Sequence, residues 1–188
     1  MIKNRNIWAI LIILFLGNTS LLFAQDSQKP SGKAASIKWY SFEEAYKLNK
    51  KKPRMMVVDI YTEWCGWCKK MDSETFANPV IADYMSKNFY CVKLDAERKD
   101  TVIIDSTTFI NPNPTNKRSA HQLAVDLLRG KMSYPSYVFL NEKGQMINVV
   151  PGFHTPSEFE SILHYFGENA YEKLKWDEFK TGFQGTVK

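Results

Sequence analysis

The chain has 188 residues with 25 basic and 20 acidic side chains, a net charge of +5 at pH 7, and 44% of its residues are hydrophobic. This length favours one domain of ordinary size, and the apolar content is enough for a buried core, which excludes wholesale disorder. The small charge, with its signs mixed along the chain, argues against a nucleic-acid partner. Three cysteines are too few for a disulfide-stapled scaffold.

The N-terminus has the pattern of a signal peptide. Lys3 and Arg5 precede an apolar run over residues 7–16, and Ala24 is a small residue at a cleavage position. An uncleaved membrane anchor is the alternative, but ten apolar residues span about 15 Å as a helix, roughly half of a bilayer core. Loss of this leader would leave 23 basic against 20 acidic side chains, a net charge of +3.

These features predict three parts of the chain. We expect a signal peptide over residues 1–24, a polar linker over 25–37 and one domain over 38–188. The protein is expected to be secreted across an inner membrane into the periplasm and to contact the membrane only if the leader stays uncleaved. Pairs of cysteine thiols can form disulfides in such an oxidising compartment.

The first half of the domain alternates helix and strand signals. Ser41–Glu44 is a capping box that opens a short helix. Residues 55–61 are almost continuously apolar, as in a strand covered on both faces, and 89–94 form a similar run. A helix is expected to begin near Cys65 and to kink or restart at Asn78-Pro79.

The second half contains further caps and a hairpin. Ser119–Gln122 reads as a capping box of a helix that is closed by Gly130. Two strands, 136–140 and 146–150, flank a turn and predict a hairpin. Residues 155–158 cap a last core helix. The order of these elements predicts an α/β fold, with a mixed sheet flanked by helices on both faces.

Two segments lie outside this pattern. Residues 98–117 are an insertion, and its alternating stretch around Asp105-Ser106 suggests a β-hairpin. Because the insertion contains no nucleophile, we expect it to affect the choice of partner rather than the chemistry. Residues 167–188 are a C-terminal extension whose aromatic residues suggest one more packing helix. His121 falls off the apolar stripe of its helix and is expected to be solvated.

The strongest chemical signal is the run 64–70, Trp-Cys-Gly-Trp-Cys-Lys-Lys, which follows a strand and opens a helix. Cys65 would lie at the helix N-terminus, where N–H groups and the helix dipole lower a thiol pKa and solvent has access. Cys68 lies one turn inside the helix and suits the resolving role. Lys69 and Lys70 add positive charge nearby.

A zinc site is the alternative for this cysteine pair. Zinc would need two more ligands, and the remaining candidates, Cys91 and the histidines at 121, 154 and 164, are scattered along the chain. We therefore expect no metal. Cys91 lies inside an apolar strand and is expected to be a buried, inert thiol.

Five segments together resemble the thioredoxin family: Val57–Asp59, Glu63–Lys69, Val92–Asp95, Ser133–Pro135 and Pro151–Gly152. The chain is similar to secreted bacterial thioredoxin-like proteins with a W-C-G-W-C-K site, and the similarity covers roughly residues 39–166. The resemblance implies a thioredoxin fold and a redox-active Cys65–Cys68 disulfide, with no other cofactor.

The resemblance also implies roles for single residues. Pro135 matches the family's cis-proline and, with Tyr134 and Gly152, would bind the substrate strand. Asp59 matches the buried acid that accepts the Cys68 proton, and burial should raise its pKa. Lys93 matches the lysine near that acid. Supporting roles fall to Trp64, Gly66, Trp67, Lys69 and Lys93.

Each of these roles has a structural alternative. Pro135 would then be an ordinary proline at the start of a strand. Asp59 would turn to a sheet edge, and Lys93 would be a solvated strand lysine.

The expected function is an extracytoplasmic thiol–disulfide oxidoreductase that reduces disulfides of client proteins and is served by an unidentified redox donor, which could be membrane-bound. Trp67 stands where general reducing thioredoxins have proline, so a disulfide oxidase or isomerase is an alternative. Another is a binding module of the same fold with an inert structural disulfide.

Overall fold

The computed structural model describes residues 36–187, so the predicted signal peptide and all but the end of the predicted linker lie outside the described residues. Within residues 36–187, no helix is long and apolar enough to cross a membrane.

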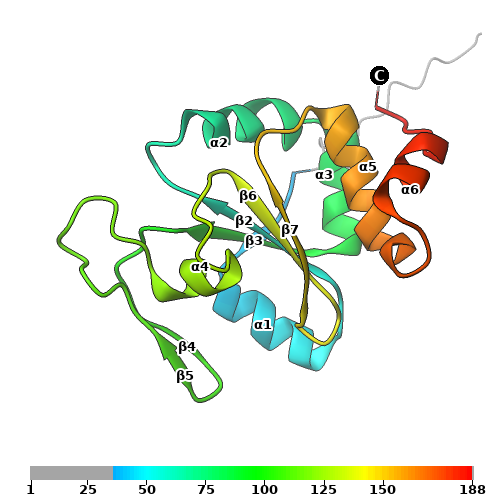
Figure 1. The fold of residues 1–188 in the computed structure, drawn as a ribbon. Helices are drawn as coiled ribbons and strands as arrows, with labels where there is room; N and C mark the ends of the chain where they lie inside the picture. The colour runs from blue at the N-terminus through cyan, green and yellow to red at the C-terminus, as the bar shows by residue number, and fades with distance from the viewer. Residues whose placement is uncertain (1–35, 188) are drawn as a thin grey trace, which may run out of the picture. The chain divides into compact units, whose positions relative to one another are not determined.

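A mixed five-stranded sheet forms the centre of the fold (Figure 1). Its strands lie in the order β1-β3-β2-β6-β7. Neighbouring strands among β1, β2 and β3 run parallel, whereas β6 is antiparallel to both β2 and β7. The strands are β1 (Trp39–Tyr40), β2 (Met56–Tyr61), β3 (Tyr90–Asp95), β6 (Ser136–Leu140) and β7 (Met146–Pro151).

Helices cover both faces of this sheet, as the sequence predicted. One face packs against α1 (Phe42–Lys51) and α4 (Gln122–Leu127). The other face packs against α3 (Pro79–Asn88), α5 (Pro156–Gly167) and the π-helical turn Met71–Thr75 that continues α2 (Gly66–Lys70). Because side chains alternate along a strand, Val58 and Ile60 enter the first core, and Val57 and Phe139 the second.

Most of the predicted helix starts are confirmed. Ser41 and Thr155 each form a capping box with a glutamate three residues on. Asn78 caps α3, and Pro79 occupies its first turn, so the helical segment restarts there as expected.

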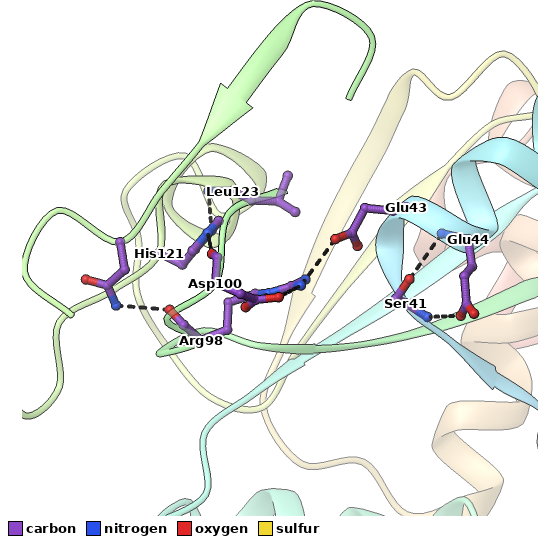
Figure 2. Close-up of polar contacts among 8 residues, drawn as sticks. Ser41, Glu43, Glu44, Arg98, Asp100, His121 and Leu123 are labelled. Carbon is purple, nitrogen blue, oxygen red and sulfur yellow. Dashed lines mark hydrogen bonds and ion pairs between the residues drawn. The ribbon is translucent and has the colours of Figure 1, made fainter. Parts of the chain in front are cut away.

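The predicted start of α4 is wrong, and so is the predicted exposure of His121. His121, not Ser119, is the N-cap residue, and its Nδ1 accepts a hydrogen bond from the Leu123 N–H at 3.2 Å. The His121 Nε2 lies 3.0 Å from the backbone oxygen of Asp100 (Figure 2). The residue is 0% exposed. Burial lowers the pKa of His121. The insertion covers this histidine, which local periodicity does not reveal.

The insertion contains the predicted hairpin. Strands β4 (Val102–Ile104) and β5 (Thr107–Phe109) pair around Asp105, which has a φ of 52°. The hairpin joins the domain through the buried side chain of Val102 and through hydrogen bonds from α1 to Asp105. The predicted C-terminal helix is also present as α6 (Trp176–Gly182), whose Trp176 and Phe179 rings contact Tyr165 of α5.

Candidate active site

The two cysteines of the 64–70 run form a disulfide at the start of α2. Their Cα atoms lie 5.3 Å apart. Cys65 is the N-cap residue of α2, and its Sγ accepts a hydrogen bond from the Cys68 N–H at 3.0 Å. A helix N-terminus stabilises negative charge, so once the disulfide is reduced this position favours a thiolate on Cys65.

Access to the disulfide differs from the prediction. Cys65 was expected to be open to solvent and Cys68 buried, but the two residues are 4% and 3% exposed. Burial therefore does not distinguish the attacking from the resolving sulfur. The distinction lies in the hydrogen bond from the Cys68 N–H to the sulfur of Cys65.

Asp59 lies on the sheet face that is covered by the helical segment from α2 onward. It shares this face with its cross-strand neighbours Lys93 and Tyr137. The Asp59 residue is 2% exposed, so it is not turned to a sheet edge. Its Oδ2 pairs with the Lys93 Nζ at 2.9 Å, while its Oδ1 has no hydrogen-bond partner among residues 36–187.

The surroundings of Asp59 shift its protonation. Burial raises the pKa of this carboxyl to about 6, against the opposing attraction of Lys93. The same buried surroundings, together with the charge of Asp59, raise the pKa of the neighbouring Tyr137.

Lys93 is held by more than Asp59. It also pairs with Asp72 in the π-helical turn, and its Nζ lies 4.9 Å from the Trp39 ring centroid and 5.2 Å from that of Tyr61. Burial opposes the charge on Lys93, but the attraction of both carboxylates raises its pKa. The prediction from sequence missed Asp72, although its place four residues after Cys68 puts both on one face of the helical segment.

The segment before β6 meets the residue that precedes Cys65, through the rings of Tyr134 and Trp64. The peptide bond between Tyr134 and Pro135 is cis. The Gly152 N–H donates to the Pro135 carbonyl at 2.8 Å, and Gly152 has a φ of 93°, which favours glycine. The structure thus brings Pro135 and Gly152, two of the residues predicted to bind substrate, into contact.

Exposed aromatic side chains flank the disulfide in sequence. Trp64 is 51% exposed and Trp67 is 58% exposed. The Trp64 ring meets the Tyr134 ring edge-on at 5.9 Å, whereas Trp67 packs against Phe153 at 5.5 Å. Apolar surface beside a redox centre is suited to contact with a macromolecular partner.

The remaining predicted residues occupy simpler positions. Gly66 is exposed, and no atom would lie within 4 Å of a Cβ added there. Lys69 is exposed and lines a cavity of about 320 Å³ that also reaches Cys68 and Asp72. Cys91 is buried, and burial raises the pKa of its thiol to about 12, as expected for an inert thiol.

Comparison with known proteins gives a family for this arrangement. The family model described as "Thioredoxin-like domain" matches residues 42–167. An uncharacterized protein of Archaeoglobus fulgidus is 29% identical over 99 residues, which cover 53% of this chain and 73% of that protein. The thiol:disulfide interchange protein DsbD of Pasteurella multocida is 23% identical over 169 residues, which cover 86% of this chain and 26% of DsbD.

A solved structure shows the same fold. The structure titled "DsbH Oxidoreductase" superposes with a TM-score of 0.52 at 18% identity, covering 72% of this chain and 87% of that one. The fold expected from the sequence is therefore confirmed. The chain spans only about a quarter of the DsbD relative, so the activity of that whole protein does not transfer to it directly.

Proposed function

The chain belongs to the thioredoxin-like domain family, and from that premise we propose that it is a thiol–disulfide oxidoreductase that reduces disulfides of client proteins outside the cytoplasm. The observation that carries this proposal is the Cys65–Cys68 disulfide at the N-terminus of α2, on the sheet face that holds the buried Asp59. An inert structural disulfide has no need of a buried acid with a pKa near neutrality.

The proposed reaction begins from the reduced pair. The Cys65 thiolate attacks one sulfur of the client disulfide, which breaks that bond and releases the first client sulfur as a thiolate. A mixed disulfide between Cys65 and the client remains. The helix N-terminus acts here by favouring the anionic form of Cys65.

Cys68 completes the transfer of two electrons. Asp59 accepts the proton of the Cys68 thiol, and the resulting thiolate attacks Cys65 Sγ. The mixed disulfide breaks, the second client thiolate leaves and the Cys65–Cys68 disulfide forms. With a pKa of about 6, Asp59 is mostly ionised at neutral pH yet is a stronger base than an ordinary aspartate.

Substrate contact is assigned to the segment around Pro135. In this proposal the backbone at Tyr134 and Pro135 holds the client strand against the disulfide, and Gly152 supports the Pro135 carbonyl. Trp64 and Trp67 supply apolar surface on the two sides of the pair. An external dithiol must then reduce the Cys65–Cys68 disulfide for the next cycle.

The proposed location outside the cytoplasm rests on the predicted signal peptide. Residues 1–24 combine basic residues, an apolar run and a small residue at position 24. Cell fractionation should recover the protein outside the cytoplasm with an N-terminus at Gln25. Recovery of the full-length chain from the cytoplasm would contradict this location.

The reduction potential of the Cys65–Cys68 pair tests the proposed activity. A client reductase should equilibrate near the range of thioredoxins and glutaredoxins, about −270 to −200 mV. A potential below about −300 mV would indicate an inert structural disulfide, and one near −120 mV would indicate an oxidase. Reduction of insulin should accompany the first result and should be lost in Cys65→Ser.

A further inference from the structure

A cleft of about 1010 Å³ begins at Trp64, the residue before Cys65. One wall is formed by the ends of β2 and β3, with Glu63, Asp95 and Glu97. The other wall is formed by the insertion and the residue after it, with Lys99, Lys117 and Arg118. The loop after β5 and the loop between β2 and α2 lie on the same side of the molecule in Figure 1.

The insertion wall contacts the active site through Trp64. The Arg118 guanidinium lies 4.8 Å from the Trp64 ring centroid, and the indole Nε1–H donates to Glu97 Oε1 at 2.8 Å. Trp64 also meets Tyr134, the residue before Pro135. The cleft is therefore continuous with the surface that is assigned to the client strand.

Buried Asn111 holds the insertion wall in place. Its Nδ2 donates to the Arg98 carbonyl at 3.1 Å and to the Ser119 carbonyl at 2.7 Å, which ties the two ends of the loop together. Its Oδ1 accepts from the Ser119 hydroxyl at 2.6 Å. A wall fixed in this way loses little entropy when a ligand binds to it.

The charged side chains of the insertion wall that form no ion pair within residues 36–187 are basic. Arg98 is paired with Glu43 and Asp100 (Figure 2), whereas Lys99, Lys117 and Arg118 form no ion pair within the described part of the chain. Both Lys117 and Arg118 are exposed. The carboxylates of the opposite wall repel acidic groups and so direct an acidic side chain toward the insertion.

We propose that this cleft is a client subsite in which Lys117 and Arg118 bind an acidic side chain close to the client cysteine. The inference rests on the proposed function and adds a substrate preference to it. The insertion would then set which disulfides are reduced, while the chemistry stays with Cys65 and Cys68. Complementary charge of this kind favours encounter and register more than it adds tight binding.

Peptide disulfides of one length test the subsite. Each substrate is a symmetric disulfide of two identical peptides joined through a central cysteine. In one series Glu, Gln or Lys stands two residues before the cysteine, and in the other series two residues after the cysteine. With dithiothreitol as electron donor, kcat/KM should fall in the order Glu, Gln, Lys in one series, by about two- to fivefold in all, as exposed ion pairs allow. Added salt should reduce this preference.

Two double variants complete the test. Lys117→Gln with Arg118→Gln should abolish the preference for the Glu peptide over the Gln peptide. Lys143→Gln with Lys173→Gln removes the same charge at exposed positions that do not line the cleft, and it should keep the preference. Equal rates for all three peptides in both series, or a preference that survives in the first variant, would overturn the inference. If the wild-type protein reduces no peptide, the proposed function fails instead.

Discussion

Asp59 shows how one residue can carry a cost to folding and a benefit to chemistry. Its place on β2 puts it on the face beneath the disulfide helix, where water is excluded and, among residues 36–187, Lys93 alone pairs with its charge. Burial of a carboxylate is unfavourable, so its pKa rises to about 6. The raised pKa is the property that a proton acceptor for Cys68 needs at neutral pH.

This assignment predicts that Asp59→Asn stabilises the oxidised protein in a pH-dependent way. Below about pH 4 the carboxyl is protonated in both the folded and the unfolded chain. Between about pH 4 and 6 only the unfolded chain releases the proton, so wild-type stability falls as pH rises and stays low above pH 6. The variant lacks this loss and should be more stable at pH 8 by about 1–3 kcal/mol.

Urea unfolding of both proteins at pH 4 and pH 8 measures this difference. Lys93 keeps Asp72 as a partner in the variant, so its charge is not left unpaired. Asp83→Asn, which breaks an exposed pair with Lys87, serves as the control and should change stability by less than about 1 kcal/mol. A wild-type protein that is more stable than Asp59→Asn at pH 8 would refute the assignment.

His121 predicts the opposite dependence on pH. Burial lowers its pKa, and both ring nitrogens are engaged when it is neutral. As pH falls below about 6.5, the unfolded chain binds a proton on this residue before the folded chain does, so stability is lost with acid. His121→Asn keeps an N-cap acceptor for Leu123 and should reduce the fall in Tm between pH 7 and pH 5.

His154 provides the comparison for this test, because burial lowers its pKa too. His154→Asn should remove a separate part of the fall, and the two effects should add, since they arise at different sites. An unchanged pH slope in His121→Asn would show that His121 has no part in acid sensitivity.

At the scale of elements, the insertion is part of the domain rather than an appendage. Val102 of β4 is buried in the core beneath α1 and α4, and Asp105 at the hairpin turn accepts hydrogen bonds from Tyr46 and Lys50 of α1. His121 and Asn111 then tie the loop to the start of α4. Removal of the whole insertion would therefore expose core surface as well as change the client cleft.

Adjacent residues of β4 offer a matched pair for this conclusion. Val102 is 0% exposed and Ile103 is 60% exposed. Val102→Ala should lower the free energy of unfolding by about 1–3 kcal/mol through lost burial, and Ile103→Ala should change it by less than about 0.5 kcal/mol. Denaturant titration measures both, and equal effects would mean that the hairpin does not pack on the core.

Local signals made most elements predictable from the sequence. Capping residues and apolar runs act over a few positions, so α1, α3, α5 and strands β2, β3, β6 and β7 were found without tertiary information. Strand β1 was missed because its two residues, Trp39 and Tyr40, are too few to show an alternation. The start of α4 was misplaced because its cap depends on a histidine that a distant loop covers.

The residues of the candidate site likewise fall into those that local sequence signals predict and those that depend on tertiary packing. Cys65 and Cys68 were identified from their spacing at a predicted helix start, and Asp59 from its match to the family's buried acid within an apolar strand. Asp72 and the aromatic rings around Lys93 come together only when β1, β3 and the π-helical turn pack. No short sequence motif therefore predicts their contact with Lys93. The closure of Cys65 from solvent likewise depends on the folded surface and not on its place at a helix start.

At the scale of the whole molecule, Cys65 is the proposed attacking sulfur and Cys68 the resolving one, with the client held between the disulfide and Pro135. The family, the fold and the disulfide do not by themselves decide which sulfur attacks. The placement of Cys65 at the N-cap of α2, with its sulfur accepting the Cys68 N–H, supports the assignment.

Capture of a disulfide-linked peptide tests this assignment most directly. Cys65→Ser, Cys68→Ser and Cys91→Ser are each reduced, freed of reductant and mixed with the peptide, and the products are weighed by intact mass spectrometry. Cys68→Ser should accumulate a one-to-one mixed disulfide at Cys65, and Cys65→Ser should form little or none. Cys91→Ser should turn over like the wild-type protein. Accumulation in Cys65→Ser with none in Cys68→Ser would reverse the roles of the two cysteines and contradict the mechanism.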